Sequence, residues 1–130
     1  MNARTAKARP KILVVDDSEI VCDSVCSMLE PRGYTVVSLT SLFAFTQTLQ
    51  AERPDLVLVD VAMPALSGDK LIEFSRKHHE GVYVMVLFSS RAKEELAALA
   101  RQCGAAGFIQ KTGDAERLQR EVESFLPRAR

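Results

Sequence analysis

Short apolar runs alternate with helical patterns along the whole chain, and this alternation constrains the fold more than any other feature. Strands are expected at 12–15, 34–39, 56–59, 82–88 and 107–110. Helical patterns are expected at 18–29, 42–49, 66–78, 93–103 and 118–126. Strict alternation requires right-handed parallel crossovers. We therefore expect an α/β fold, a doubly wound five-stranded parallel sheet covered by five helices.

Size and charge predict one ordinary domain. The chain has 130 residues and no visible linker or repeat, and residues 1–10 are expected to be a flexible basic tail before a domain at 11–127. Lysine plus arginine and aspartate plus glutamate both number 17, so charge gives no reason to expect direct nucleic-acid or membrane partners. No apolar run reaches the roughly 20 residues of a membrane helix, and no signal peptide is visible. A cytoplasmic location is expected.

Cysteine and histidine residues give no sign of a zinc or redox centre. Cys22 and Cys26 stand four apart on an expected helix, and Cys103 is remote in sequence. Structural zinc needs more ligands at other spacings, so the expected role is that of small core residues. The pair His78 and His79 could suggest a phosphohistidine relay, but its charged neighbours at a helix end favour a solvated surface.

Chemically active side chains follow four of the five expected strands. Asp16 and Asp17 follow the first strand, Asp60 the third, Ser89 the fourth and Lys111 the fifth. In a doubly wound sheet the ligand site lies beyond these carboxyl ends, where the strand order reverses. We therefore expect three carboxylates, a hydroxyl and an amine to converge on one rim of the sheet.

The adjacent aspartates are the unusual part of this set, because like charges at the end of a buried strand repel each other and resist desolvation. One aspartate alone could simply cap the following helix. Two of them directed toward a third acid form a seat for a hard cation, and oxygen ligands with room for water favour Mg²⁺. Such an ion would let a negatively charged phosphoryl group approach.

These residues and their order resemble the receiver domain of two-component response regulators, over residues 11 to about 126. The acid pair follows the first strand, and the loop pattern D-x-x-M-P-x-x-x-G is present at 60–68. The hydroxyl is Ser89, and Phe108 is the aromatic residue three before Lys111. The resemblance implies a flavodoxin-like sheet of order 2-1-3-4-5.

The resemblance also implies a phosphoryl-transfer mechanism. Asp60 would be the phosphoacceptor and would take a phosphoryl group from a sensor histidine kinase or phosphotransfer protein. The cofactor Mg²⁺ would be held by Asp17, Asp60 and the backbone carbonyl of Ala62, with Asp16 assisting through water. Lys111 would pair with a phosphoryl oxygen.

Output would depend on a surface with two states. The Ser89 hydroxyl would turn toward the phosphoryl group and Phe108 would turn inward, changing the surface of the fourth helix, fifth strand and fifth helix. Phe108 could instead be an ordinary core residue. The surface would control a downstream protein target, a missing effector domain or a homodimer formed through the fourth and fifth helices.

The resemblance implies no conventional enzyme. The chain, full-length or a fragment, would catalyse only its own phosphorylation and slow dephosphorylation.

Three positions qualify the resemblance. Thr112 replaces the proline that usually follows the lysine, and a trans bond is expected because a non-proline cis bond costs about 2.5 to 4 kcal/mol. The replacement keeps open an alternative, a receiver-like interaction module that works without phosphorylation. Ala62 offers no side chain to hold a hydrolytic water, and Arg91 could shield the acyl phosphate, so slow self-dephosphorylation is expected.

Rival uses of the same sheet fit less well. An aspartate-nucleophile phosphatase needs a second acid two residues after the nucleophile, where this chain has Ala62. A flavodoxin would place flavin phosphate against Asp16 and Asp17, which would repel it. The nucleotide-binding pattern G-x-x-x-x-G-K-[ST] does not occur in the sequence.

One aromatic residue lies outside the apolar stripe of its expected helix. The stripe is formed by Leu42, Phe45 and Leu49, and Phe43 lies off it. Phe43 is therefore expected at a partner contact or at a partly buried helix edge.

Overall fold

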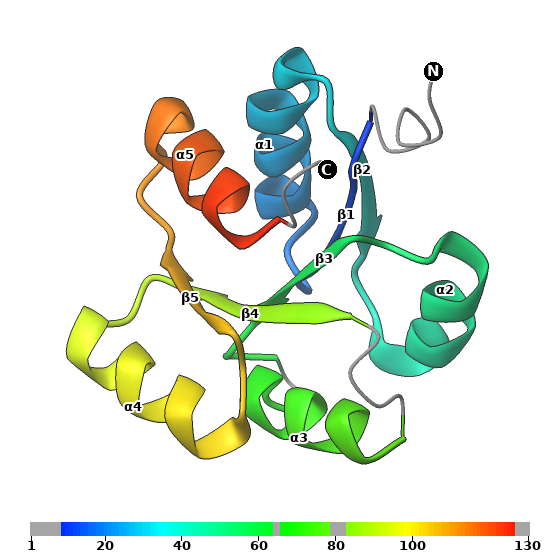
Figure 1. Cartoon of the computed structure of the whole chain (residues 1–130), viewed down its shortest axis with the longest axis vertical. Coiled ribbons are helices and arrows are strands. Elements are labelled where there is room, and N and C mark those ends of the chain that lie inside the picture. The colour runs from blue at the N-terminus through cyan, green and yellow to red at the C-terminus, as the bar shows by residue number, and fades with distance from the viewer. Residues whose placement is uncertain (1–8, 64–65, 79–82, 127–130) are drawn as a thin grey trace.

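One parallel sheet, with strand order β2-β1-β3-β4-β5, organises the part of the chain that this computed structural model describes: residues 9–63, 66–78 and 83–126. Its strands are β1 (Lys11–Val15), β2 (Thr35–Leu39), β3 (Leu56–Asp60), β4 (Val84–Ser89) and β5 (Gly107–Gln110). The α-helices are α1 (Glu19–Leu29), α2 (Phe45–Glu52), α3 (Gly68–His78), α4 (Lys93–Cys103) and α5 (Ala115–Phe125). The doubly wound α/β fold and the strand order are confirmed (Figure 1).

Helices cover both faces of the sheet. Buried side chains of α1 and α5 form one core cluster, and those of α2, α3 and α4 form another on the opposite face (Figure 1). Along β1, Ile12 and Val14 join the first cluster while Leu13 and Val15 join the second. This alternation follows from the two-residue period of a strand, and it explains why β1 is apolar on both sides.

Several elements begin or end one to three residues from the predicted positions, and the third helix and the fourth strand are two examples. The helix predicted from residue 66 begins at Gly68, because the Gly68 amide donates to the Val61 carbonyl (3.1 Å) and closes the loop after β3 first. The strand predicted at 82–88 runs through Val84–Ser89 in the described residues, and residue 82 lies outside them. Both differences fall in the segments that connect the sheet with its helices.

The exposed aromatic Phe43 corrects one expectation. It is 99% exposed in the 3-10 turn Leu42–Ala44 that precedes α2, so the prediction that it lies at a partly buried helix edge is wrong. The Ser41 hydroxyl accepts from the Phe43 amide (3.2 Å) and fixes this turn. Phe45 is buried while Phe43 faces solvent, as expected for a residue off the apolar stripe of this segment.

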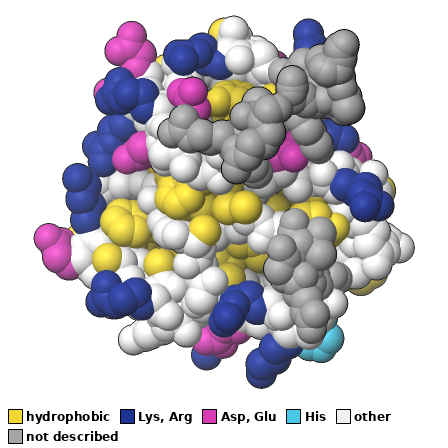
Figure 2. All heavy atoms as spheres, viewed as in Figure 1, with side chains coloured by type: hydrophobic (Ala, Val, Ile, Leu, Met, Phe, Trp, Pro, Cys, Tyr) yellow, Lys and Arg dark blue, Asp and Glu magenta, His cyan; other side chains and the backbone are white. Residues whose placement is uncertain are grey.

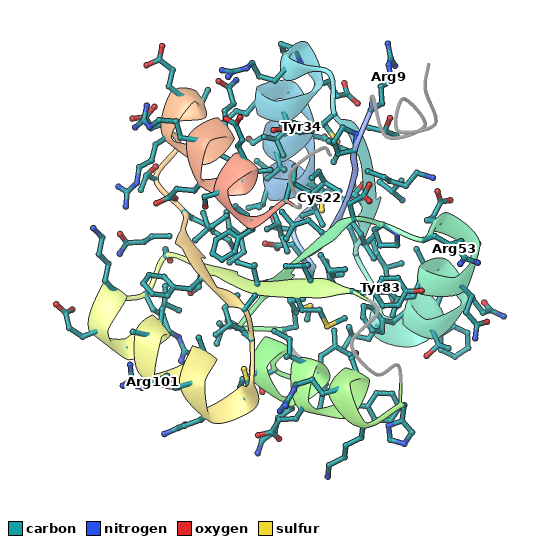
Figure 3. The ribbon with its side chains drawn as sticks, in the orientation of Figure 1. Arg9, Cys22, Tyr34, Arg53, Tyr83 and Arg101 are labelled. Carbon is teal, nitrogen blue, oxygen red and sulfur yellow. The ribbon has the colours of Figure 1, made fainter. Side chains whose placement is uncertain are left out.

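Cysteine, histidine and tyrosine side chains serve packing in this structure. Cys22 and Cys103 are buried free thiols, which confirms core roles for both. His78 is exposed at the end of α3 and stacks on Phe74 with ring centroids 4.1 Å apart, while residue 79 lies outside the described residues. Tyr83 donates its hydroxyl to a carbonyl of α2 at 3.1 Å and so ties the start of β4 to that helix (Figure 3).

The surface carries charges of both signs. Figure 2 shows Lys and Arg side chains and Asp and Glu side chains around the margin of one face, with hydrophobic side chains in a band across its middle. Among the described residues, none of the helices has the length and apolar character needed to cross a membrane. The tail and C-terminal boundary expected at 1–10 and 127 fall largely on residues 1–8 and 127–130, which are not described.

Candidate functional site

Acidic side chains occupy the point where the strand order reverses, between β1 and β3. Asp16 follows β1, where its amide donates to the carbonyl of Leu39 at 3.1 Å, and Asp60 is the last residue of β3. Asp16 and Asp60 are only 1% and 6% exposed, whereas Asp17 is exposed. One carboxylate oxygen from each of Asp16, Asp17 and Asp60, here called the acid trio, lies within 4.8 Å of the others. The predicted convergence of three carboxylates is present.

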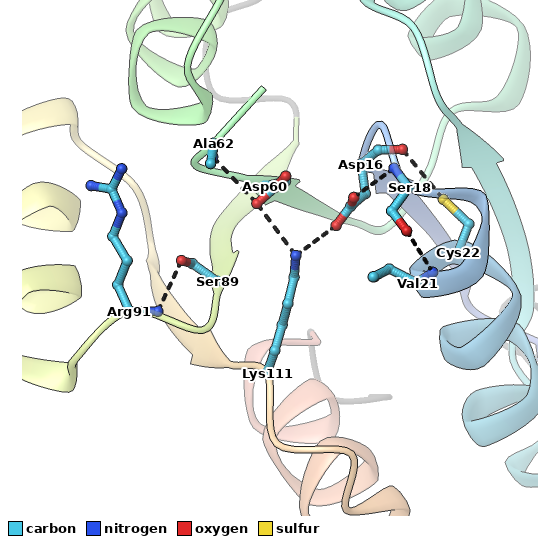
Figure 4. Close-up of polar contacts among 9 residues, drawn as sticks. All are labelled: Asp16, Ser18, Val21, Cys22, Asp60, Ala62, Ser89, Arg91 and Lys111. Atoms are coloured by element: carbon cyan, nitrogen blue, oxygen red, sulfur yellow. Dashed lines mark hydrogen bonds and ion pairs between the residues drawn. The ribbon is translucent and has the colours of Figure 1, made fainter. Parts of the chain in front are cut away.

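Asp16 is held in place by the start of α1. Its Oδ1 accepts from the Ser18 amide (2.9 Å), and its backbone carbonyl accepts from the Cys22 thiol (3.5 Å) (Figure 4). The residue that caps α1 is Ser18, whose hydroxyl accepts from the Val21 amide at 3.2 Å. Neither aspartate is the helix cap, so capping does not explain the acid pair.

Lys111 lies between the two buried carboxylates (Figure 4). Its Nζ is 2.8 Å from Asp16 Oδ2 and 3.4 Å from Asp60 Oδ1. The short contact with Asp16 is an ion pair without hydrogen-bond alignment, so Asp16 Oδ2 is a buried oxygen without a hydrogen-bond donor among the described residues. One ammonium group against three carboxylates leaves the cluster with excess negative charge.

Asp60 presents one oxygen for chemistry. Its Oδ1 accepts from the Ala62 amide (3.3 Å) and from Lys111 (3.4 Å). Its Oδ2 accepts no hydrogen bond from the described residues. Two donors therefore orient the carboxylate while the second oxygen remains available to a reacting group.

Gly68 allows α3 to begin directly against the backbone of Asp60. A Cβ atom at position 68 would collide with the Asp60 carbonyl oxygen and come within 3.0 Å of Val59 Cγ1. Only glycine permits this close approach of two backbone segments. The glycine of the D-x-x-M-P-x-x-x-G pattern thus helps to fix the position of the loop after Asp60.

Ser89 ends β4 at the same rim. It is 4% exposed, and its hydroxyl accepts from the Arg91 amide at 3.1 Å (Figure 4). The Lys111 amide donates to the Ser89 carbonyl (2.8 Å), which keeps the ends of β4 and β5 together. Phe108, earlier on β5, is half-buried and packs against the cluster on the α2, α3 and α4 face.

The Thr112 replacement leaves Lys111 in contact with the acid trio. The described residues contain no cis peptide bond, which confirms the expected trans bond. The Thr112 hydroxyl accepts from the Asp114 amide (3.3 Å), and Gly113 takes a positive φ of 79°. These features form the turn that leads from β5 into α5, where the Asp114 side chain accepts from the Arg117 amide.

Two contacts of the site were not predicted. Burial, and after it the nearby Asp16 carboxylate, raise the pKa of the Cys22 thiol from 9.0 to about 11, so this thiol stays neutral beside the acid trio. Gln110 donates its side-chain amide to the Arg91 carbonyl at 2.9 Å. A polar residue immediately before Lys111 is the only sign of this second contact in the sequence.

The strand order, the acid trio at its reversal point and a lysine from β5 together define a receiver-type domain. The chain belongs to the response regulator receiver domain family, whose pattern matches residues 12–123. Receiver domains generally bind Mg²⁺ at an acidic pocket, and the acid trio is such a cluster.

Relatives differ in how much of their length this chain covers. The transcriptional regulatory protein CseB of Streptomyces coelicolor is 26% identical over 90% of this chain, which spans 49% of that relative. The protein PilH of Pseudomonas aeruginosa is 26% identical over 89% of this chain and is covered over 97% of its own length. The chemotaxis protein CheY4 of Vibrio cholerae has the same fold, with a TM-score of 0.82 and 24% identity over 91% of this chain and 99% of its own. The chain thus spans about half the length of CseB and nearly all of PilH.

Proposed function

We propose that the chain is a phosphoryl-accepting signalling switch in which Asp60 is the acceptor. The observation that carries this proposal is the carboxylate of Asp60: it is buried, oriented by two donors through Oδ1, and free of hydrogen bonds from the described residues at Oδ2. Oδ2 would attack the phosphorus of a phosphohistidine on a sensor histidine kinase or phosphotransfer protein. The phosphorus–nitrogen bond would break as the acyl phosphate forms.

The acid trio fits the Mg²⁺ that such a transfer requires. Three oxygen ligands lie within 4.8 Å of one another, the buried Asp16 Oδ2 has the ion pair with Lys111 but no aligned hydrogen-bond donor among the described residues, and the cluster has excess negative charge. Asp17, Asp60 and the backbone carbonyl of Ala62 would hold the ion, and Asp16 would assist through water. When bound, the ion would neutralise charge that otherwise repels the incoming phosphoryl group.

Lys111 and Ser89 would bind the phosphoryl oxygens. The Lys111 ammonium is already 3.4 Å from Asp60 and would pair with one phosphoryl oxygen. The Ser89 hydroxyl would leave the Arg91 amide and turn toward another. Phe108 would then turn inward, and the surface of α4, β5 and α5 would change.

The changed surface would control partner binding. The partner would be a downstream protein target, an effector domain joined to this domain at 11–127, or a second copy bound through α4 and α5. Neither nucleic acid nor membrane would bind directly. A receiver-like interaction module without phosphorylation is the alternative, raised by Thr112 in place of proline.

The phosphoryl group is expected to survive for minutes or longer. Ala62 has no side chain that could position a hydrolytic water. The Arg91 guanidinium pairs with Glu95 on the surface of α4 (3.1 Å), and an exposed pair of this kind contributes about 1 kcal/mol at most, so Arg91 could leave it to shield the acyl phosphate. Loss of the label within seconds, without a phosphatase, would contradict this expectation.

Incubation with a small phosphodonor and Mg²⁺, followed by intact mass measurement, tests the proposal. We expect the mass to rise by one phosphoryl group, and Asp60→Asn to abolish the rise. Asp23→Asn is the matched control, since Asp23 is an exposed acid on α1 outside the acid trio. A wild-type protein that gains no phosphoryl group and binds no beryllofluoride would refute the proposal and leave the interaction module.

A further inference from the structure

We infer that Gln110 is a latch that holds residues 89–91 in the conformation in which the Ser89 hydroxyl is bound to the backbone. This inference rests on the proposed function, and it adds how the resting state of the switch is maintained. Gln110 is a positioning residue in this scheme, because it would act through Ser89 rather than on the phosphoryl group.

Residues 89–91 are held by β5 at both ends. Ser89 and Gln110 are register partners in the sheet, and the Lys111 amide donates to the Ser89 carbonyl at 2.8 Å. At the other end, Gln110 Nε2 donates to the Arg91 carbonyl at 2.9 Å. Between these two anchors the Arg91 amide donates to the Ser89 hydroxyl at 3.1 Å (Figure 4). The three bonds join β5, Ser89 and Arg91 into one arrangement.

This arrangement opposes the movement that Ser89 would make. If the hydroxyl turned toward a phosphoryl oxygen, the partly buried Arg91 amide would lose its acceptor. A movement of the backbone at Arg91 would bring this amide to a new acceptor. That movement would pull the Arg91 carbonyl away from Gln110, so the latch has to open for the hydroxyl to be released fully.

Gln110 also connects the loop with Phe108. Residues two apart on a strand point to the same face, so Phe108 and Gln110 share the face of β5 that is covered by α4. Phe108 packs there against the cluster that contains Leu96 and Ala100 of α4. When the latch opens, the side chain that loses its partner is therefore the neighbour of Phe108 on this face.

The latch would bias the switch without locking it. It is a single neutral hydrogen bond at an exposed position, so its removal is expected to change the equilibrium between the two loop conformations by about 3- to 10-fold. A ligand that binds the released conformation gains the same factor in affinity when the resting conformation predominates.

Beryllofluoride binding in the presence of Mg²⁺ tests the inference, with amide NMR signals as the readout. We expect Gln110→Ala to bind about 3- to 10-fold more tightly than the wild type. Gln110→Met keeps a neutral side chain of similar length that cannot donate to a carbonyl, and it should bind about as tightly as Gln110→Ala. Gln102→Ala, an exposed glutamine of α4, is the control and should match the wild type. Affinities of both Gln110 variants within twofold of the wild type would overturn the latch.

Two further measurements distinguish the latch from a general effect on packing and from failure of the proposed function. In a Ser89→Ala background the Gln110→Ala substitution should have no effect on affinity, and a retained effect would overturn the role through Ser89. If the wild type binds no beryllofluoride, the proposed function fails, and the latch is then decided by hydrogen exchange of the Arg91 amide. Gln110→Ala should speed this exchange about 3- to 10-fold, and unchanged exchange would overturn the inference.

Discussion

Replacing the phosphoacceptor should make the metal-free protein more stable. The Asp60→Asn substitution removes one charge from the acid trio but leaves an amide oxygen that can still accept from the Ala62 amide. If the carboxylates of Asp16, Asp17 and Asp60 repel each other without a cation, the free energy of unfolding should rise in this variant. The effect has the opposite sign to that of most substitutions of buried residues.

The magnitude follows from the distances in the cluster. The carboxylate oxygens of the acid trio lie at most 4.8 Å apart, and at that separation two unit charges repel by about 3.5 kcal/mol at an effective dielectric constant of about 20, so each of the two acidic neighbours of Asp60 contributes at least this much. The attraction to Lys111 at 3.4 Å is about 4.9 kcal/mol on the same scale. Repulsion therefore exceeds attraction by about 2 kcal/mol, and screening at the exposed Asp17 reduces this difference. We expect Asp60→Asn to be more stable than the wild type by about 1 to 2 kcal/mol.

Urea unfolding in a chelator and in Mg²⁺ measures this effect. The wild type should gain about 1.4 kcal/mol when the ion is at tenfold excess over its dissociation constant, and Asp60→Asn should gain little. The control Asp23→Asn should match the wild type within about 0.5 kcal/mol in chelator and should keep the gain in Mg²⁺. If Asp60→Asn were less stable than the wild type in chelator, the account of the acid trio as a repulsive cluster would be wrong.

Three other perturbations test separate parts of the structure. Gly68→Ala should lower the free energy of unfolding by about 1 to 3 kcal/mol in urea, because the added Cβ collides with the Asp60 carbonyl. Ser75→Ala should raise it by up to about 1 kcal/mol, since the buried Ser75 hydroxyl lacks a hydrogen-bond partner among the described residues. The Cys22 thiol has a pKa raised from 9.0 to about 11, so its folded form resists deprotonation. The contribution of the neutral thiol to the free energy of unfolding should be complete below pH 9. Between pH 9 and about 11 the free energy of unfolding of the wild type should fall by at most about 1.4 kcal/mol per pH unit, and that of Cys22→Ala should fall less steeply.

The fold could be predicted because its determinants are local and periodic. The run at 12–15 is apolar at every position, and the structure places its alternate residues against helices on opposite faces. α4 and β5 have the predicted bounds, since Gly104 with a φ of 80° ends α4 and leads into the strand. Where a boundary depends on a tertiary contact, as at Gly68 beside Asp60, the periodic pattern misplaced it by two residues.

The site could be predicted to the level of strand ends but not of side-chain contacts. Parallel strands bring their carboxyl ends together, so the positions of Asp16, Asp60 and Lys111 in the sequence were enough to place them on one rim. The bond from Gln110 to the Arg91 carbonyl depends on the path of the loop between β4 and α4, for which the sequence has no periodic signal. Phe43 shows the same limit, because its position off the apolar stripe was predicted from the sequence but its nearly complete exposure in a 3-10 turn was not.

A single lysine shared between two buried acids links the parts of the proposed switch. In the resting site the Lys111 ammonium is closer to Asp16 than to Asp60, and it is the counter-charge of the buried Asp16 Oδ2. A phosphoryl group on Asp60 would attract the same ammonium, and Asp16 would then lose its counter-charge unless a cation replaced it. Removal of divalent ions should therefore weaken the contact between the Lys111 ammonium and the phosphoryl group. The covalent bond between Asp60 and the phosphoryl group would remain. The like charges that follow β1 are thus tolerable at rest through Lys111, and after phosphorylation they would depend on the metal.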